Sequence, residues 1–385
     1  MSKIMPLVSI ITVNYNGKRF LGDCFSSLLN LNYPKNKLEI FMVDNGSNDD
    51  SVKYMKNKFP MIRIINNSEN NYAKANNLGI KAAKGGYIAL INNDIKVDKN
   101  WLINLITAIQ KDASIGALGS KILFMDGLIQ SVGHQEYPNY YWGDIGFREE
   151  DKGQYNTYKE VISICGCSVL YRKKCLKNVG LLDEDFNMYM EDVDMALRCR
   201  NKGWKLFTCP DSVIQHEYHG TTKNDDNSFF WVETNRLLLI AKHWPEKLAD
   251  ALSGKDYFTI KNDYNNARDI GQVMGKVFSK LLKEHGYDVL NKLSPGLFEA
   301  IRRIYNLEKN YLIQNVMNER DRKNNLIIEL NTFKKENLKL EEDLSFLKRQ
   351  KDQEIVSLIQ QKESELASLE QQKNQELDSL QQQKD

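Results

Sequence analysis

The sequence lacks the features of several large classes of protein. It has only six cysteines in 385 residues, too few for a disulfide scaffold, and Cys165-Gly166-Cys167 is not a paired C-x-x-C zinc pattern. We therefore interpret the cysteines as reduced, buried thiols of a cytosolic protein. No run approaches the ~20 apolar residues that cross a bilayer, and residues 4–13 predict a first strand rather than a signal peptide.

A strong net charge is also missing. The 53 basic and 51 acidic residues leave a formal charge of +2, which argues against the strongly basic domain typical of nucleic-acid-binding proteins. What the sequence does have is length and a hydrophobic content of 42%. These suffice for one large domain with an appendage, or for two domains.

Strand-like and helical patterns alternate along the first part of the chain. Such alternation predicts an α/β domain with a mostly parallel sheet that is covered by helices on both faces. Ligands of these sheets bind beyond the carboxyl ends of the strands. The expected strands are 7–13, 38–43, 63–65 and 87–91, and the expected helices are 20–29, 50–58, 75–83 and 101–109. Three strand ends carry polar clusters, namely Asn14-Tyr15-Asn16, Asp44-Asn45-Gly46 and Asn92-Asn93-Asp94.

The pattern changes after residue 124. Residues 124–160 are rich in glycine, tyrosine and charge, and they predict a long functional loop. Order returns with expected strands at 168–171 and 204–209 and expected helices at 189–201 and 229–242. We place a catalytic domain at 1–248, a helical extension without a chemical motif at 249–315, and a coiled coil at 316–385.

The tail carries two regular repeats. From residue 326 to 347 apolar residues alternate spacings of four and three, which is a heptad seam with Asn337 at an a position. From 348 to 385 the spacings alternate three and eight, and this eleven-residue period favours a straight or slightly right-handed coil. The repeats predict a homo-oligomer or a partner coiled coil through 319–385, and the alternative is a solvated single helix. The heptad positions are Leu326, Leu330, Phe333, Asn337, Leu340, Leu344 and Leu347.

Two carboxylates at strand ends are candidates for nucleotide binding and metal binding. Asp44 could accept a hydrogen bond from an imide N–H of uracil or thymine, or from a ribose hydroxyl. Asp94 could bind Mg²⁺ with substrate phosphates completing the coordination shell, and Asn92 could bond a ribose hydroxyl. For both carboxylates the alternative is an ordinary turn residue.

A second acidic cluster opens the helical pattern at 189–201. Glu191, Asp192 and Asp194 could simply complement the helix dipole, but the bulky apolar residues 188–190 before them would raise the pKa of a carboxylate toward a value useful for a base. We interpret Asp194 as structural. His216 lies in a segment that we expect to be a loop. Its imidazole could be one more ligand of the cation at Asp94, whereas a zinc site would need more protein ligands than this segment offers.

Taken in order, these segments resemble the family-2 inverting glycosyltransferases of GT-A fold, in the branch that includes bacterial rhamnosyltransferases. The resemblance covers roughly 6–245. It rests on the strand 8–16, the D-N-G-S-x-D turn at 44–49, the N-x-G-I element at 76–80, the degenerate D-x-D motif at 92–94, the D-E-x-F…E-D-x-D block at 183–194, and His216 with Gly220-Thr221. Each motif is short, and their order gives the specificity.

The resemblance implies a role for each matched position. Thr12, Asn14 and Asp44 hold the nucleotide and Asn92 touches the ribose, with Asn76 in the same nucleotide-sugar-binding set. Asp94 and His216 bind Mg²⁺ or Mn²⁺ at the diphosphate. Asp192 is the general base and Glu191 steers donor or acceptor, so that the configuration inverts in one displacement. The sequence departs from the family where Asn92 replaces the first aspartate of the D-x-D motif, which makes the metal role less certain.

The implied donor is a UDP- or dTDP-sugar and the implied acceptor is a glycan or a lipid-linked glycan. We expect a cytoplasmic protein, peripheral at the inner face of a membrane if its acceptor is there. One rival is a nucleotidyltransferase, which would usually show a basic, glycine-rich phosphate loop that Gly17-Lys18-Arg19 does not provide. The other is a catalytically inactive scaffold that acts through its coiled coil.

Overall fold

The computed structural model describes residues 5–218, 228–253 and 267–286, together with residues 362 and 364. The chain divides into two compact units, Met1–Lys309 and Asn310–Asp385, and nearly all described residues belong to the first. The predicted coiled coil, most of the predicted extension and the Gly220-Thr221 element lie outside the described residues. None of the described helices is long and apolar enough to span a membrane.

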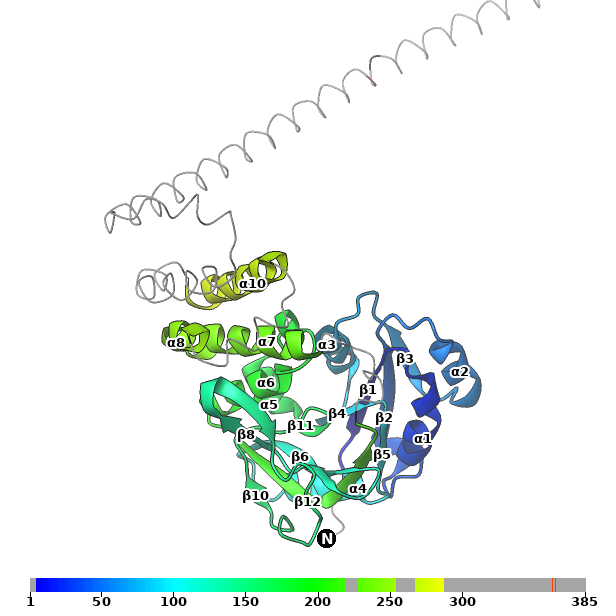
Figure 1. Cartoon of the computed structure of the whole chain (residues 1–385). Helices are drawn as coiled ribbons and strands as arrows, with labels where there is room; N and C mark the ends of the chain where they lie inside the picture. The colour runs from blue at the N-terminus through cyan, green and yellow to red at the C-terminus, as the bar shows by residue number, and fades with distance from the viewer. Residues whose placement is uncertain (1–4, 219–227, 254–266, 287–361, 363, 365–385) are drawn as a thin grey trace, which may run out of the picture. The chain divides into compact units, whose positions relative to one another are not determined.

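The first unit is built around one ten-stranded mixed sheet with the order β10-β12-β6-β11-β4-β1-β2-β3, in which β5 also pairs with β12 and β7 with β6 (Figure 1). Strands β8 and β9 form a separate hairpin. The strands are β1 Val8–Asn14, β2 Leu38–Asp44, β3 Arg63–Asn66, β4 Tyr87–Asn92, β5 Ile95–Val97, β6 Ile115–Phe124, β7 Ile129–Ser131, β8 His134–Tyr137, β9 Tyr141–Asp144, β10 Lys159–Glu160, β11 Ser168–Arg172 and β12 Lys205–His216.

Helices cover both faces of this sheet, as the sequence predicts. They are α1 Lys18–Leu29, α2 Ser51–Lys58, α3 Tyr72–Ala82, α4 Trp101–Ile109, α5 Lys173–Val179, α6 Glu191–Asn201, α7 Ser228–His243, α8 Leu248–Ser253 and α10 Ala267–His285. Side chains of a strand alternate between faces, so Val8 and Ile10 of β1 pack in one core with α1, α2 and α4. Ile11 and Val13 pack in the other core with α3, α5 and α6.

A third core lies beside α6. Leu237–Ala241 of α7, Leu248 of α8, and Val273, Val277 and Leu281 of α10 pack together there with Phe186 and Val193. The apolar positions of α10 recur at four-residue intervals, which places them on one helix face. Helix α10 therefore belongs to the first compact unit and packs on α7 (Figure 1).

The direction of each strand determines what meets at one edge of the sheet. Strands β2 and β4 run parallel to β1, so Asn14, Asp44 and Asn92 end together. Strand β11 runs antiparallel to β4, so the segment before Ser168 starts at that same edge. Strands β6 and β12 are parallel to each other and β6 is antiparallel to β11, which also places the end of β12, at His216, at this edge.

Two local predictions were wrong. Residues 124–160 are not a long loop, because β7, β8, β9 and β10 lie within them. These short strands pair partly with each other and partly with β6 and β12. They contain no long apolar run, so the sequence pattern did not predict them as strands. His216 is the last residue of a twelve-residue strand rather than part of a loop.

Candidate functional site

Asn14 and Asp44, which the sequence placed at the nucleotide, are neighbours at the carboxyl edge. They are register partners at the ends of β1 and β2, and the Asn14 Nδ2 lies 3.4 Å from the Asp44 Oδ1. Asn14 also donates to Ser47 Oγ at 3.0 Å, and the Ser47 backbone N–H donates to Asp44 Oδ2 at 3.1 Å. The D-N-G-S turn thus fixes the orientation of a buried carboxylate at a strand end.

Asn93 is a member of this network that the sequence reasoning missed. Its Nδ2 donates to Asn14 Oδ1 at 2.7 Å, which joins the ends of β1 and β4. The approach requires a glycine at position 17, because a Cβ there would lie 2.1 Å from Asn93 Nδ2 and 2.7 Å from Asn14 Oδ1. The adjacent polar clusters after the two strands were the available signal.

The other predicted donor-binding residues lie nearby but differ in their surroundings. Asn92, at the end of β4, accepts a hydrogen bond from the Tyr72 hydroxyl at 3.0 Å. Thr12 is fully buried in β1, and its hydroxyl makes no hydrogen bond among the described residues. Asn76 is fully buried in α3, where its amide donates to the Tyr72 carbonyl at 3.1 Å, so its amide group contributes to the helix interior.

Asp94 and His216 are 122 residues apart in the sequence and are in contact in the fold. Strand β5 begins one residue after Asp94, and its first residue, Ile95, pairs with His216 of β12. This register places Asp94 Oδ1 3.0 Å from His216 Nε2, and both side chains are buried. The two predicted metal ligands are therefore brought together.

The second nitrogen of His216 defines what this pair can hold. Gln130, a buried residue of β7, places its Oε1 2.7 Å from the ring Nδ1. If Nδ1–H donates to that oxygen, a neutral imidazole directs the Nε2 lone pair at a carboxylate oxygen, and a cation or proton must lie between them. Neighbouring ligands of an octahedral ion with bonds of about 2.1 Å are about 3.0 Å apart, so the pair fits Mg²⁺ or Mn²⁺.

Asp192 lies in the first turn of α6. Its Oδ2 accepts the backbone N–H of Gly166 at 2.8 Å, and its Oδ1 accepts that of Val193 at 2.8 Å. The carboxylate is half-buried, so it is held in one orientation without being sealed from a substrate. Position 166 must be small, because a Cβ there would lie 3.1 Å from the Asp192 Oδ2.

Glu191 differs from Asp192 in its ionisation. Burial raises its pKa well above the usual range, and the Asp192 carboxylate raises it further. Its Oε2 is buried and has no hydrogen-bond partner within the described part of the chain. The raised pKa favours the protonated form of Glu191, so the raised pKa expected for this cluster is found at Glu191.

Asn235 of α7 positions the start of α6 and was not predicted. Its Nδ2 lies within 2.7–2.8 Å of the backbone carbonyls of Phe186, Met188 and Tyr189. In this segment Asn187, Tyr189 and Met190 have positive φ values of 57°, 71° and 65°. Such conformations are strained in non-glycine residues, so the three hydrogen bonds hold the strained turn that delivers Glu191 and Asp192.

Asp194 faces the third core rather than this edge. Although burial alone raises its pKa, the hydrogen bond from His243 and the charges of Arg198 and Lys242 lower it below the usual range. The three partners lie at 2.8 Å from its carboxylate oxygens. This environment agrees with the structural interpretation of Asp194.

Comparison with known proteins shows what this domain is similar to. Residues 9–180 match the model of glycosyl transferase family 2. The O-antigen biosynthesis protein RfbC of Myxococcus xanthus is 27% identical over 224 residues, which are 55% of this chain and 17% of that protein. A dolichyl N-acetyl-alpha-D-glucosaminyl phosphate 3-beta-D-2,3-diacetamido-2,3-dideoxy-beta-D-glucuronosyltransferase of Methanococcus voltae is 25% identical over 57% of this chain and 69% of its own length.

A solved structure shows the same fold. The crystal structure of GalNAc-T7 with UDP, GalNAc and Mn²⁺ superposes with a TM-score of 0.55 at 16% identity, and covers 76% of this chain and 59% of that one. Together these matches support a family-2 glycosyltransferase domain with a GT-A-like sheet in the first part of the chain. The chain spans only a small share of the Myxococcus relative.

Proposed function

We propose that this chain is an inverting glycosyltransferase that moves a sugar from a UDP- or dTDP-sugar to a glycan or lipid-linked acceptor. The observation that carries the proposal is the buried Asp94–His216 pair, which lies at the same sheet edge as Asn14 and Asp44. A divalent-ion site beside a nucleotide-binding edge suits a substrate whose leaving group is a nucleoside diphosphate.

The donor half of the site consists of Asn14, Asp44 and Asn92, with Thr12 and Asn76 buried behind them. The Asp44 carboxylate accepts the imide N–H of uracil or thymine, which is absent from adenine and cytosine. The buried Thr12 hydroxyl has no hydrogen-bond partner among the described residues. This supports a donor site here, because buried polar groups ordinarily have a partner, and the bound nucleotide could supply it.

Asp94 and His216 hold Mg²⁺ or Mn²⁺, and Gln130 fixes the histidine tautomer that leaves Nε2 free to bind it. The bound ion supplies charge neutralisation for the departing diphosphate. The GalNAc-T7 structure was solved with UDP and Mn²⁺, which is consistent with this donor and ion class.

The chemical step assigned to this chain's own residues is proton removal. An acceptor hydroxyl attacks the anomeric carbon on the face opposite the diphosphate, and Asp192 takes the hydroxyl proton as the new C–O bond forms and the bond to the diphosphate breaks. The backbone N–H groups of Gly166 and Val193 keep the Asp192 carboxylate in place. In its protonated form, which the raised pKa favours, Glu191 offers an O–H group to the donor sugar or the acceptor.

The name of the Myxococcus relative supports a role in polysaccharide or lipid-linked glycan assembly. With that role the protein would work in the cytoplasm, at the inner face of a membrane when the acceptor is lipid-linked. Oligomerisation through 319–385, which lies outside the described residues apart from residues 362 and 364, stays a prediction. The second candidate is an inactive scaffold that works through the tail; the ordered environment of Asp192 favours the enzyme.

Calorimetric titration of UDP and dTDP, with and without Mn²⁺, tests the proposal. We expect one nucleotide to bind in a Mn²⁺-dependent way. Loss of a residue that only supports a metal ligand typically weakens binding 10–100-fold, so Asp94→Ala, which removes a ligand itself, should weaken it more. Asp144→Asn is the control, because Asp144 also faces a histidine but lies outside the donor site. No binding of either nucleotide by folded protein with metal present would favour the scaffold.

A further inference from the structure

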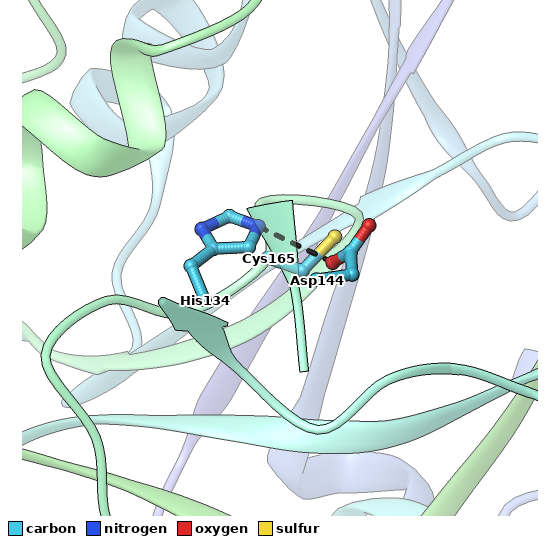
Figure 2. Close-up of side chains that lie close together, drawn as sticks. All are labelled: His134, Asp144 and Cys165. Carbon is cyan, nitrogen blue, oxygen red and sulfur yellow. Dashed lines mark ion pairs between the residues drawn. The ribbon is translucent and has the colours of Figure 1, made fainter. Parts of the chain in front are cut away.

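A second histidine–aspartate pair lies on the β8–β9 hairpin, close to Asp192. His134 and Asp144 are directly opposite each other in the antiparallel register, and His134 Nε2 is 3.4 Å from Asp144 Oδ1. Cys165 completes the group from the segment before β11, and the three potential ligand atoms all lie within 4.8 Å of one another. Figure 2 shows the three side chains converging, with the ion pair as a dashed line.

We propose that His134, Asp144 and Cys165 form a second metal site, which takes a thiophilic divalent cation such as Zn²⁺ and joins the β8–β9 hairpin to the loop that positions Asp192. This site does not depend on the proposed transferase activity. One imidazole, one carboxylate and one thiolate form a ligand set suited to Zn²⁺ and unlike the oxygen-rich shells of Mg²⁺.

The spacing of the ligand atoms fits a tetrahedral ion. With Zn–N and Zn–O bonds of about 2.05 Å, the edge of the tetrahedron is about 3.4 Å, which equals the observed separation of His134 Nε2 and Asp144 Oδ1. Edges to a thiolate are about 3.6 Å, so a shift of Cys165 Sγ by about 1 Å closes the set. Three protein ligands leave the fourth position to water or a substrate hydroxyl.

The surroundings orient the histidine for this role. His134 Nδ1 lies 3.1 Å from Ser163 Oγ, and the His134 backbone N–H donates to the Ser163 carbonyl at 2.9 Å. With Nδ1 occupied by the hydroxyl, Nε2 is the atom directed at Asp144. The Asp144 Oδ1 is buried, and within the described part of the chain its polar neighbour is the His134 ring at 3.4 Å, the atom with which it would share the ion.

Metal binding at this site competes with protons on His134 and Cys165. Burial by itself lowers the pKa of His134, but the hydrogen bond with Asp144 and the charge of Asp192 raise it well above the usual value. The hydrogen bond with Cys167 and burial raise the pKa of Cys165. Zn²⁺ binds a neutral imidazole and a thiolate, so it competes with protons at both groups.

The position of the site gives it a consequence for the reaction centre. Gly166, whose N–H donates to Asp192 Oδ2, directly follows Cys165. A metal bond to Cys165 therefore fixes the peptide that orients Asp192, and it also fixes β8 and β9 against the same loop.

Cobalt substitution provides the test. Chelator-treated full-length protein is titrated with Co²⁺, and we expect a thiolate-to-cobalt absorption band in the near ultraviolet with the intense visible bands of tetrahedral Co²⁺, both displaced by Zn²⁺. The Asp94–His216 site has no sulfur ligand and cannot produce the thiolate band. Cys165→Ser should abolish the band and His134→Gln should weaken Zn²⁺ binding at least ~10-fold.

Cys209→Ser is the matched control, because Cys209 is a buried free thiol on β12 and should leave the band unchanged. The proposal is overturned if wild-type protein shows no thiolate band, or if the band survives in Cys165→Ser and disappears in Cys209→Ser or Cys167→Ser. Nucleotide titration of Cys165→Ser separates the two proposals, since donor binding should persist when this site is lost.

Discussion

Two aspartate–histidine pairs of this protein have the same chemical groups but different spacings and surroundings. Asp94 and His216 are 3.0 Å apart, with Gln130 behind the ring and strand ends around them. Asp144 and His134 are 3.4 Å apart, with Ser163 behind the ring and Cys165 alongside. The first spacing suits neighbouring ligands of an octahedral ion and the second suits those of a tetrahedral one.

A third pair shows what a structural arrangement looks like. His243 lies 2.8 Å from Asp194, but Arg198 and Lys242 also contact that carboxylate, so protein cations already satisfy it. The comparison teaches that the other neighbours of a pair decide its role. Where cationic side chains surround the carboxylate, as at Asp194, a metal ion is not needed. Among the described residues the carboxylates of Asp94 and Asp144 each form an ion pair with a histidine, and there we propose metal sites.

The largest effect is expected at Asp192, whose carboxylate belongs to none of the three pairs. Asp192→Asn should lower the transfer rate 10²–10⁴-fold, the usual contribution of a general base, without changing nucleotide affinity or the cobalt spectrum. Release of nucleoside diphosphate from the donor measures the rate. Glu191→Gln is the matched control and should change the rate little, because the raised pKa of Glu191 already favours its uncharged form. Equal losses in both variants would contradict the assignment.

Asp194→Asn tests the structural pair. Removing the charge takes the buried carboxylate from Arg198 and leaves Lys242 with Asp183 alone, which should lower the free energy of unfolding by about 3–5 kcal/mol. The folded pKa of Asp194 lies below the unfolded value of about 4, so its contribution is present above that pH and is lost as the pH falls.

Urea titrations at several pH values measure this difference. The stability gap between wild type and Asp194→Asn should be full near pH 7 and narrow below pH 4 or so. A gap that widened on acidification would contradict the assignment. Metal and nucleotide binding should not change at temperatures where the variant is folded.

The groups behind the two rings sharpen the comparison further. Gln130→Met should weaken Mn²⁺ binding at Asp94 and His216 about 10–100-fold, the range for second-shell partners, and leave the cobalt–thiolate band intact. Ser163→Ala should do the reverse, weakening the band and sparing Mn²⁺-dependent nucleotide binding. If either variant affected both readouts equally, the two pairs would not be separate sites.

The smallest effect is expected at the residue between the second pair and Asp192. Gly166→Ala places a Cβ 3.1 Å from Asp192 Oδ2, which forces the carboxylate to shift by a few tenths of an ångström. A shift of that size should slow transfer roughly threefold to tenfold. Gly86→Ala is the control, because a Cβ there meets no atom within 4 Å. An unchanged rate in Gly166→Ala would show that the Gly166 contact does not position the base.

Much of the fold could be predicted because its signals are local. Apolar strands bounded by polar clusters, and the helix at Trp101–Ile109, are visible in short windows and match the structure closely. The hairpin of β8 and β9 could not be predicted, because its strands are four residues long and mostly polar or aromatic. Their pairing depends on partners elsewhere in the chain, which no short window contains.

The sequence by itself determined the parallel edge, since alternating strands and helices bring Asn14, Asp44 and Asp94 to one side of a sheet. It suggested that His216 joins Asp94, but it did not determine how these strand ends and residues 163–167 come together. That was decided by β11, whose antiparallel insertion between β4 and β6 brings residues 163–167 to this edge, and by the register of β5 against β12. Contacts between residues 122 positions apart depend on strand order and register, and both are settled by the packing of the whole sheet.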